Sequence, residues 1–292
     1  MIIVTHNGAY HADDVFAVAI LKLIHPDAKV VRTRDSQLIS EADIVVDVGY
    51  IYDLETNRFD HHQPEFKDIR VDGTPYSACG LIWKHFSSKL CSNEEAVMID
   101  SRLICGIDAI DNGVPFGKNK FGAKPYGLSK VLELFMPTFQ ETKEFDTAFL
   151  EAVELAKSIL VREMAVAKAQ LSAKIIVRKA LTEYSDKDYV VIEEYCPWKT
   201  TVIKESDKLL AVFGRSDGAW TVSTVPIEFD TYDSRIDLPE SWAGLQNEEL
   251  AKVTGVSDAI FCHKARFIAA AQSKEGAIML AKLACEESKK HQ

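Results

Sequence analysis

Apolar positions in the first part of the chain form short continuous runs, and these alternate with segments whose apolar residues recur at helical spacing. Three runs predict strands, at 2–5, 29–34 and 44–48. Three segments of helical spacing predict helices, at 14–24, 77–86 and 94–110. Strands that alternate with helices are typical of a parallel sheet with helices on its faces.

The longest apolar stripe begins at residue 145 and continues to about residue 171. One apolar side chain falls every three or four residues, at Phe149, Val153, Ala156, Leu160, Met164, Ala167 and Leu171. This spacing predicts one helix of roughly seven turns. We interpret it as a connection between two domains, with the boundary within or before it, and divide the chain into domains at 1–145 and 146–292.

The pattern after this helix changes to runs of strand character. Such runs occur at 189–192, 201–204, 209–215 and 220–225, with a turn at 216–218. The chain then offers a strand at 259–262 and a helix at 275–288. The sequence therefore predicts an α/β protein, with a parallel-sheet N-terminal domain, a long connecting helix and a smaller α+β C-terminal domain.

Composition limits the function classes. The chain has 292 residues, of which 47% are hydrophobic, and a formal net charge of -10. An acidic chain is poorly suited to non-specific duplex binding, although bound cations would offset this charge locally. No run of about 18 apolar residues and no secretory signal pattern occurs. The cysteines are scattered without a CxxC pair, so we expect reduced thiols in a cytoplasmic protein.

The first candidate site follows the first predicted strand. His6, His11, Asp13 and Asp14 lie in the loop and helix start there, and the carboxyl end of a strand is where open α/β sheets bind ligands. Helix capping would explain one of the aspartates, but not both histidines. We therefore expect His6, His11 and Asp13 to bind a metal. The sequence leaves open whether Asp14 caps the helix or binds the metal.

The second and third motifs are Asp47 and the triplet Asp60-His61-His62. Asp47 ends an apolar run, where a lone buried carboxylate is costly unless it is paired or metal-bound; the alternative is a turn residue before Gly49. In Asp60-His61-His62, adjacent side chains of extended chain point to opposite sides. One histidine can therefore bind metal while the other faces substrate or an acid, the alternative being a surface histidine pair.

The fourth motif contains Asp108 and Asp111, three positions apart and on one face if the segment is helical. Asn112-Gly113 then predicts the end of that helix. One aspartate can complete the metal site while the other caps or orients it. The sequence does not choose between them.

These motifs together resemble the DHH phosphoesterase superfamily, which includes single-strand exonucleases, inorganic pyrophosphatases, exopolyphosphatases and nucleotide phosphodiesterases. The amino-acid sequence of the motifs resembles one branch more closely, the melanocyte-proliferating-gene (MYG) family of metal-dependent hydrolases. The segments that carry this resemblance are THNGAYHADDVFAVAIL, DVGYIYDLETNRFDHHQPEF, YSACGLIWKHF, GIDAIDNGVPFG and LQNEELAKVTGVSDAIFCHKARFI. They span nearly the whole chain and imply a DHH-like fold for the first domain.

The resemblance also implies roles. The metal ligands would be His6, His11, Asp13, Asp47, His61 and one of Asp108 and Asp111. Asp47 would bridge two divalent ions, and His62 would face the phosphate. Mixed imidazole and carboxylate ligands favour Mn²⁺, with Zn²⁺, Fe²⁺ and Mg²⁺ as alternatives. Arg58 is a candidate to stabilise the extra negative charge of the transition state. It is therefore a third candidate catalytic residue beside Asp47 and His62.

The second domain departs from the family in one place. Where the family has a glycine-rich stretch, this chain has alanines at 265, 269 and 270, which bears on substrate choice. The candidate substrate contacts are cations, namely Lys130, His263, Lys264 and Arg266.

The resulting interpretation is a metal-dependent phosphodiesterase, a 3′–5′ exonuclease on single-stranded RNA or DNA. The alternatives are a pyrophosphatase or polyphosphatase, a cyclic-dinucleotide phosphodiesterase, and a catalytically degenerate nucleotide-binding or regulatory module. The expected partner is then a phosphodiester substrate. We expect no association with a membrane, and the sequence leaves open whether the chain forms a homodimer.

Overall fold

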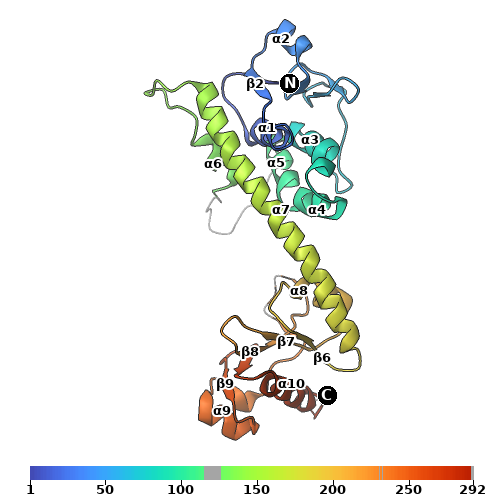
Figure 1. Ribbon diagram of the computed structural model, residues 1–292, viewed down its shortest axis with the longest axis vertical. Coiled ribbons are helices and arrows are strands. Elements are labelled where there is room, and N and C mark those ends of the chain that lie inside the picture. The colour runs from blue at the N-terminus through green and yellow to red at the C-terminus, as the bar shows by residue number, and fades with distance from the viewer. Residues whose placement is uncertain (115–125, 230, 232, 291–292) are drawn as a thin grey trace. The chain divides into compact units, whose positions relative to one another are not determined.

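The chain forms two compact units, Met1–Lys168 and Ala169–Gln292. This computed structural model describes residues 1–114, 126–229, 231 and 233–290, and Figure 1 traces them from blue at the N-terminus to red at the C-terminus. Within these residues, no helix is both long enough and apolar enough to cross a membrane. The last residues of the GIDAIDNGVPFG motif, 115–117, lie outside the described part.

The first unit is built on a five-stranded sheet with the order β2-β1-β3-β5-β4. Its strands are β1 (Ile2–Thr5), β2 (Lys29–Arg32), β3 (Ile44–Val46), β4 (Tyr52–Asp53) and β5 (Arg58–Phe59). The β1–β2, β1–β3 and β3–β5 pairs are parallel, and only β4 runs antiparallel, against β5. The predicted parallel sheet is confirmed, and the two-residue strands β4 and β5 add to it.

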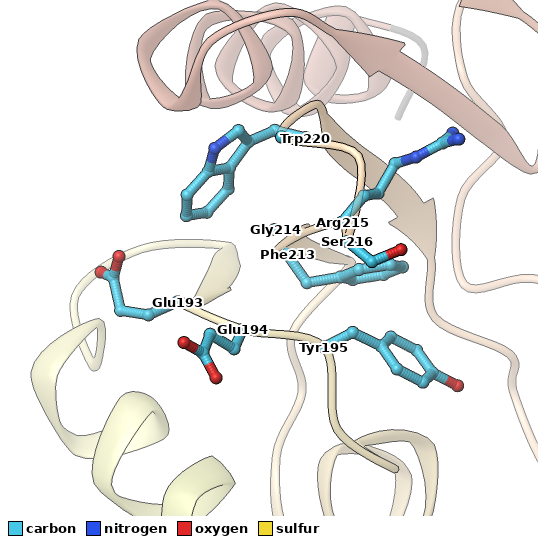
Figure 2. Close-up of a pocket in the computed structure, with 9 residues that line it drawn as sticks. Glu193, Glu194, Tyr195, Phe213, Gly214, Arg215, Ser216 and Trp220 are labelled. Carbon is cyan, nitrogen blue, oxygen red and sulfur yellow. The ribbon is translucent and has the colours of Figure 1, made fainter.

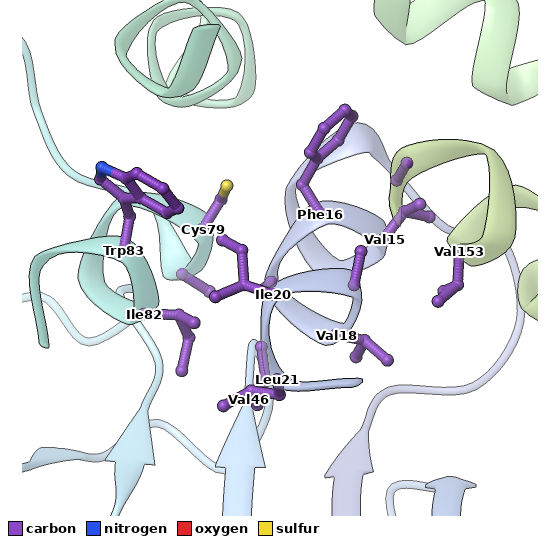
Figure 3. Close-up of a cluster of buried hydrophobic side chains, with 14 of the residues drawn as sticks. Val15, Phe16, Val18, Ile20, Leu21, Val46, Cys79, Ile82, Trp83 and Val153 are labelled. Carbon is purple, nitrogen blue, oxygen red and sulfur yellow. The ribbon is translucent and has the colours of Figure 1, made fainter. Parts of the chain in front are cut away.

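Helices pack on this sheet. They are α1 (Ala12–Ile24), α2 (Ser36–Glu41), α3 (Ala78–Phe86), α4 (Asn93–Ile99), α5 (Cys105–Asp111) and α6 (Leu128–Glu133). A short 3₁₀ turn, Ser87–Lys89, follows α3. The predicted single helix at 94–110 is interrupted, because a π-helical turn, Asp100–Ile104, separates α4 from α5. Figure 3 shows α1 at the centre of the core, with Ile20 and Leu21 facing Ile82 and Val46.

Helix α7 (Phe145–Glu183) confirms the predicted apolar stripe and extends beyond it. Phe149, Val153, Ala156 and Leu160 are buried in the core of the first unit. The compact units divide inside the helix, between residues 168 and 169. The first half of α7 packs as part of the first unit because its stripe covers that unit's core.

The second unit has its own five-stranded sheet, in the order β6-β7-β8-β10-β9. Its elements are β6 (Tyr189–Ile192), α8 (Lys199–Glu205), β7 (Leu210–Gly214), β8 (Trp220–Thr224), a 3₁₀ turn (Glu240–Trp242), α9 (Asn247–Thr254), β9 (Ala259–Cys262), β10 (Ile268–Ala271) and α10 (Lys274–Lys290). The β6–β7 pair is parallel and the other pairs are antiparallel. The predicted α/β fold class is confirmed.

One predicted strand is wrong. Residues 201–204 lie in α8, where the backbone N–H of Val202 donates to the Trp198 carbonyl at 3.0 Å. Trp198 and Val202 are both buried, on one helical face against the core of the second unit. The β-branched Thr201 and Val202 favoured a strand, but a run of four residues does not distinguish a strand from one helical turn.

Two alanines of the stretch 265–270 belong to the sheet of the second unit. Ala269 and Ala270 lie in β10, between β8 and β9, and both are fully buried. Their methyl groups therefore fill space inside the second unit.

Candidate metal centre

The candidate site lies where several chain segments meet at one edge of the first sheet. His6 directly follows β1, Asp47 directly follows β3 and His61 comes shortly after β5. Because these strands are parallel, their carboxyl ends reach the same edge. The start of α1 and the end of α5 bring the other side chains of the site.

Asp47 is the centre of this cluster. Its Oδ2 lies 3.4 Å from His6 Nε2, while its Oδ1 lies 3.5 Å from His61 Nε2 and 3.4 Å from His62 Nδ1. Its backbone is left-handed, with φ 55°, which is uncommon for a non-glycine residue. One carboxylate therefore faces different histidines with its two oxygens, which is the arrangement a bridging ligand needs.

Asp111, at the end of α5, joins the cluster from the other side. Its Oδ2 lies 3.2 Å from His61 Nε2, and its Oδ1 lies 3.9 Å from His11 Nδ1. Ligand atoms of Asp13, His61 and Asp111 all lie within 4.8 Å of one another, as do those of Asp47, His61 and His62. The structure thus brings Asp111 to the histidines.

Asp108 has different neighbours. It is fully buried, 2.7 Å from an Arg70 guanidinium nitrogen, and it accepts hydrogen bonds from Ser77 Oγ at 2.6 Å and the Gly80 N–H at 2.9 Å. Ser77 Oγ is also within hydrogen-bond distance of Asp13. Asp108 therefore supports Asp13 through Ser77, although ligand atoms of Asp13, Cys79 and Asp108 also lie within 4.8 Å of one another.

The Ser77 hydroxyl has one proton for two carboxylates. Burial raises the pKa of Asp13 well above its usual value. Burial also raises the pKa of Asp108, to about 6, against the opposing effects of Ser77 and Arg70. Burial thus raises the pKa of both carboxyl groups that the Ser77 hydroxyl contacts.

Asp14 combines the two roles between which the sequence did not decide. Its Oδ1 accepts from the backbone N–H groups of His11 at 2.9 Å and Val15 at 3.0 Å, as a helix cap does. Its Oδ2 lies 3.1 Å from His6 Nε2. Asp14 thus belongs to the site, and its capping position alone could not have shown this.

The charges of the cluster perturb one another strongly. Burial lowers the pKa of His6, but the carboxylates of Asp14 and Asp47 outweigh it and raise that pKa to about 10. Burial opposes the same effect at His61, whose pKa Asp111 and Asp47 raise to about 10. Burial would raise the pKa of Asp47, but the two histidines lower it to about 2. Strongly perturbed groups of this kind mark functional sites.

A metal fits these residues on two grounds. Buried atoms without a hydrogen-bond partner among the described residues include Asp14 Oδ2, Asp47 Oδ1 and His61 Nε2. Such atoms are costly unless something satisfies them. The donor set of imidazole nitrogens and carboxylate oxygens is also the one that Mn²⁺, Fe²⁺ and Zn²⁺ accept.

His62 lies at the exposed side of the cluster, with 53% of its side chain accessible. Its Nδ1 lies 2.8 Å from Asp60 Oδ1, and this contact raises the pKa of His62. The backbone N–H of His62 also donates to Asp60, at 3.0 Å. Asp60 therefore orients the ring and leaves Nε2 for other contacts.

Two predicted cations lie apart from the histidine cluster. The Arg58 guanidinium donates to backbone carbonyls, of Thr56 at 2.6 Å and Ala42 at 3.1 Å among others, and so ties α2 to the sheet. Lys130 pairs with Glu133 on α6. Glu133 lines a cavity of about 180 Å³ together with His11, Asp13 and Asp111. Lys130 does not line this cavity, but it contacts Glu133, which does.

The remaining predicted contacts lie in the second unit. Arg266 pairs with Asp237 at 2.8 Å, and the His263 ring accepts from the Ala265 N–H at 3.1 Å. Lys264 is exposed. Figure 2 shows a separate cavity of this unit, about 630 Å³, whose walls include Glu194, Tyr195, Arg215 and Trp220 but none of the three predicted residues.

A parallel sheet with histidine and aspartate clusters at its carboxyl edge defines an α/β protein with a candidate metal centre. More narrowly, the chain belongs to the MYG1 family. Residues 2–285 match MYG1_exonuc, described as "Uncharacterised protein family (UPF0160)". The resemblance inferred from the motifs is thereby confirmed, and with it the prediction of an enzyme.

Curated relatives cover nearly the whole chain. A MYG1 protein of Schizosaccharomyces pombe is 32% identical over 97% of this chain and 97% of its own length. The MYG1 exonuclease of Homo sapiens is 30% identical over 95% of this chain and 84% of its own length. A crystal structure of RecJ in complex with Mn²⁺ from Thermus thermophilus is 14% identical with a TM-score of 0.29, and the match covers 98% of this chain and 52% of RecJ.

Proposed function

We propose that this chain is a metal-dependent phosphodiesterase that acts as a 3′–5′ exonuclease on single-stranded RNA or DNA. The carrying observation is Asp47, a buried carboxylate whose two oxygens face different histidines. The exonuclease name of several relatives supports the nucleic-acid substrate.

The proposed ligands form two groups that share Asp47. One group would include His6 and Asp47, and the other Asp13, Asp47, His61 and Asp111, with His11 beside Asp111. Two divalent cations held there would supply Lewis acidity and a nucleophile at neutral pH, with Mn²⁺ favoured by the mixed donor set. Asp108 takes the supporting position behind Asp13.

His62 has the geometry of the residue that meets the phosphate. Its ring is held by Asp60 through Nδ1, so Nε2 is free to donate to a phosphate oxygen or to the leaving oxygen as the phosphorus–oxygen bond breaks. The contact with Asp60 raises the pKa of His62, which favours the protonated ring. We therefore assign His62 a catalytic role and withdraw Arg58, whose guanidinium is committed to backbone carbonyls.

The test is a substrate screen of the purified protein with Mn²⁺, Zn²⁺, Fe²⁺ and Mg²⁺ in turn. We expect cleavage of single-stranded oligonucleotides, with the label of a 5′-labelled strand retained in products that shorten one nucleotide at a time. Preferential hydrolysis of pyrophosphate or polyphosphate would move the chain out of the nuclease class. Nucleotide binding without cleavage under all four metals would favour the degenerate binding module.

A further inference from the structure

The loop that follows Asp47 has an unusual backbone. Asp47, Gly49 and Tyr50 all have positive φ, at 55°, 96° and 57°. Glycine adopts this region freely, but for a bulky residue such as tyrosine it is strained. Backbone strain of this kind clusters at catalytic and ligand-binding positions.

Tyr50 is held at the candidate site by Asp60. The backbone N–H of Tyr50 donates to Asp60 Oδ2 at 2.7 Å, while Asp60 Oδ1 lies 2.8 Å from His62 Nδ1. Asp60 itself is buried, at 1% exposure. One rigid carboxylate therefore fixes both the main chain of Tyr50 and the ring of His62.

The Tyr50 ring lies beside His62 and is open to solvent. The two ring centroids are 6.4 Å apart with the planes at 70°, an edge-on arrangement. Tyr50 is 68% exposed, and it belongs to no hydrophobic cluster of the described residues. Burial of the ring in the core therefore does not explain why a strained position carries an aromatic side chain.

We propose that the Tyr50 ring forms a subsite for a nucleobase next to the phosphate that His62 meets. An exposed aromatic face stacks on unpaired bases of any sequence, which is how proteins hold single strands. This inference rests on the proposed function and narrows its substrate class to phosphodiesters that carry a base. Pyrophosphate and polyphosphate offer no ring for Tyr50 to contact.

The test compares two oligonucleotides that differ only in the terminal residue, which carries a base in one and is abasic in the other. For the wild-type protein we expect higher kcat/KM on the base-bearing strand. Tyr50→Asn removes the ring but tolerates positive φ. It should lower the ratio of the two kcat/KM values about tenfold, in line with the energy of one base stack. Tyr50→Phe should preserve the ratio.

Phe139→Asn is the matched control, because Phe139 is an aromatic residue that is 97% exposed and lies outside the histidine and aspartate cluster. It should leave the ratio at its wild-type value. A wild-type ratio near one, or losses of equal size on both strands in Tyr50→Asn, would overturn the subsite, since the second result indicates displacement of Asp60 and His62.

A binding measurement separates this inference from the proposed function. With Mn²⁺ present, calorimetry should show that Tyr50→Asn weakens binding of a nucleoside monophosphate but not of inorganic phosphate. If the wild-type protein binds the nucleotide through Tyr50 and cleaves no phosphodiester, the exonuclease fails and the subsite stands. If Tyr50→Asn binds the nucleotide as the wild-type does, the subsite fails whatever the activity.

Discussion

At the scale of single residues, Asp47 is the side chain on which the proposed metal centre depends. Asp47→Ala removes the carboxylate between His6 and His61, and we expect it to lower the metal content below two ions per chain. Mutation of a residue that holds a metal ligand in place typically lowers activity about 10–100-fold. Loss of a ligand shared by two ions should therefore lower activity at least about 100-fold. Elemental analysis with kinetics measures both quantities, and an unchanged two-ion stoichiometry would remove Asp47 from the bridging role.

His62 should behave differently from Asp47. Its side chain is half exposed and held by Asp60, so His62→Ala should retain most of the bound metal. Loss of a positioned proton donor typically costs about 10²–10⁴-fold in rate. We therefore expect kcat to fall by that factor while metal content and thermal stability stay near wild-type. A parallel loss of metal would make His62 a ligand instead.

Two buried thiols give the chain a pH dependence outside the metal centre. Burial raises the pKa of Cys262 and of Cys285 from 9.0 to about 11. A raised pKa favours the folded state below the unfolded value, and this contribution disappears as the pH rises through the folded value. We expect slow native alkylation of both thiols at pH 8 and a loss of stability between about pH 9 and 11. Rapid native labelling at pH 8, detected by peptide mapping, would contradict this.

How far the sequence predicted the site depends on where each partner lies in the chain. His6 and Asp47 could be placed together because each follows an apolar run, and parallel strands end at one edge. His61 follows no apolar run, and only the Asp60-His61-His62 triplet marked it as a candidate. Asp108 and Asp111 could not be distinguished, since they share a helix. Arg70 and Ser77 engage Asp108. Arg70 lies in a segment without a strand or helix pattern, and the position of Ser77 at the start of a predicted helix gives no sign of a contact with Asp108.

At the scale of elements, α3 and α5 approach closely at a glycine. A Cβ added to Gly80 would lie 1.8 Å from Asp108 Oδ2 and 2.8 Å from the Tyr76 ring. Gly80→Ala should therefore displace Asp108, destabilise the fold by about 1–3 kcal/mol and weaken metal binding through Ser77 and Asp13. Thermal melts with and without Mn²⁺ measure both effects.

Gly106 in α5 provides the control for Gly80. A Cβ there meets no atom within 4 Å. Alanine is favoured over glycine inside a helix, so Gly106→Ala should leave stability unchanged or raise it by up to about 1 kcal/mol. Equal behaviour of the two variants would show that the contact between Gly80 and Asp108 does not constrain the site.

The elements that the sequence predicted well have one unambiguous pattern. The stripe of α7 was predicted closely because its helical spacing is long, and β1 and β6 because each is a short continuous apolar run. Helix α8 was predicted as a strand, since packing of Trp198 against the core, and not local propensity, decides its conformation. The two-residue strands β4 and β5 give no periodic signal at all.

At the scale of the whole molecule, the two units differ in what they offer a nucleic acid. The first unit carries the histidine and aspartate cluster, and the chain as a whole has a net charge of -10. Contacts to the substrate backbone then need local cations. In the second unit Arg266 is engaged by Asp237 and by the Leu238 carbonyl, whereas Lys264 is exposed with no ion pair among the described residues.

Lys264 therefore makes a sharper test of the second unit than Arg266, because its removal breaks no ion pair within the described part of the chain. If Lys264 meets a phosphate, Lys264→Ala should raise KM on oligonucleotides and reduce the slope of log affinity against log salt by about 0.7, the value of one single-strand phosphate contact. A small ester such as bis-p-nitrophenyl phosphate cannot reach a remote contact, so its kcat/KM should stay constant. Arg266→Ala should instead lower the melting temperature. An unchanged salt slope in Lys264→Ala, or equal losses on both substrates, would exclude Lys264 from the substrate path.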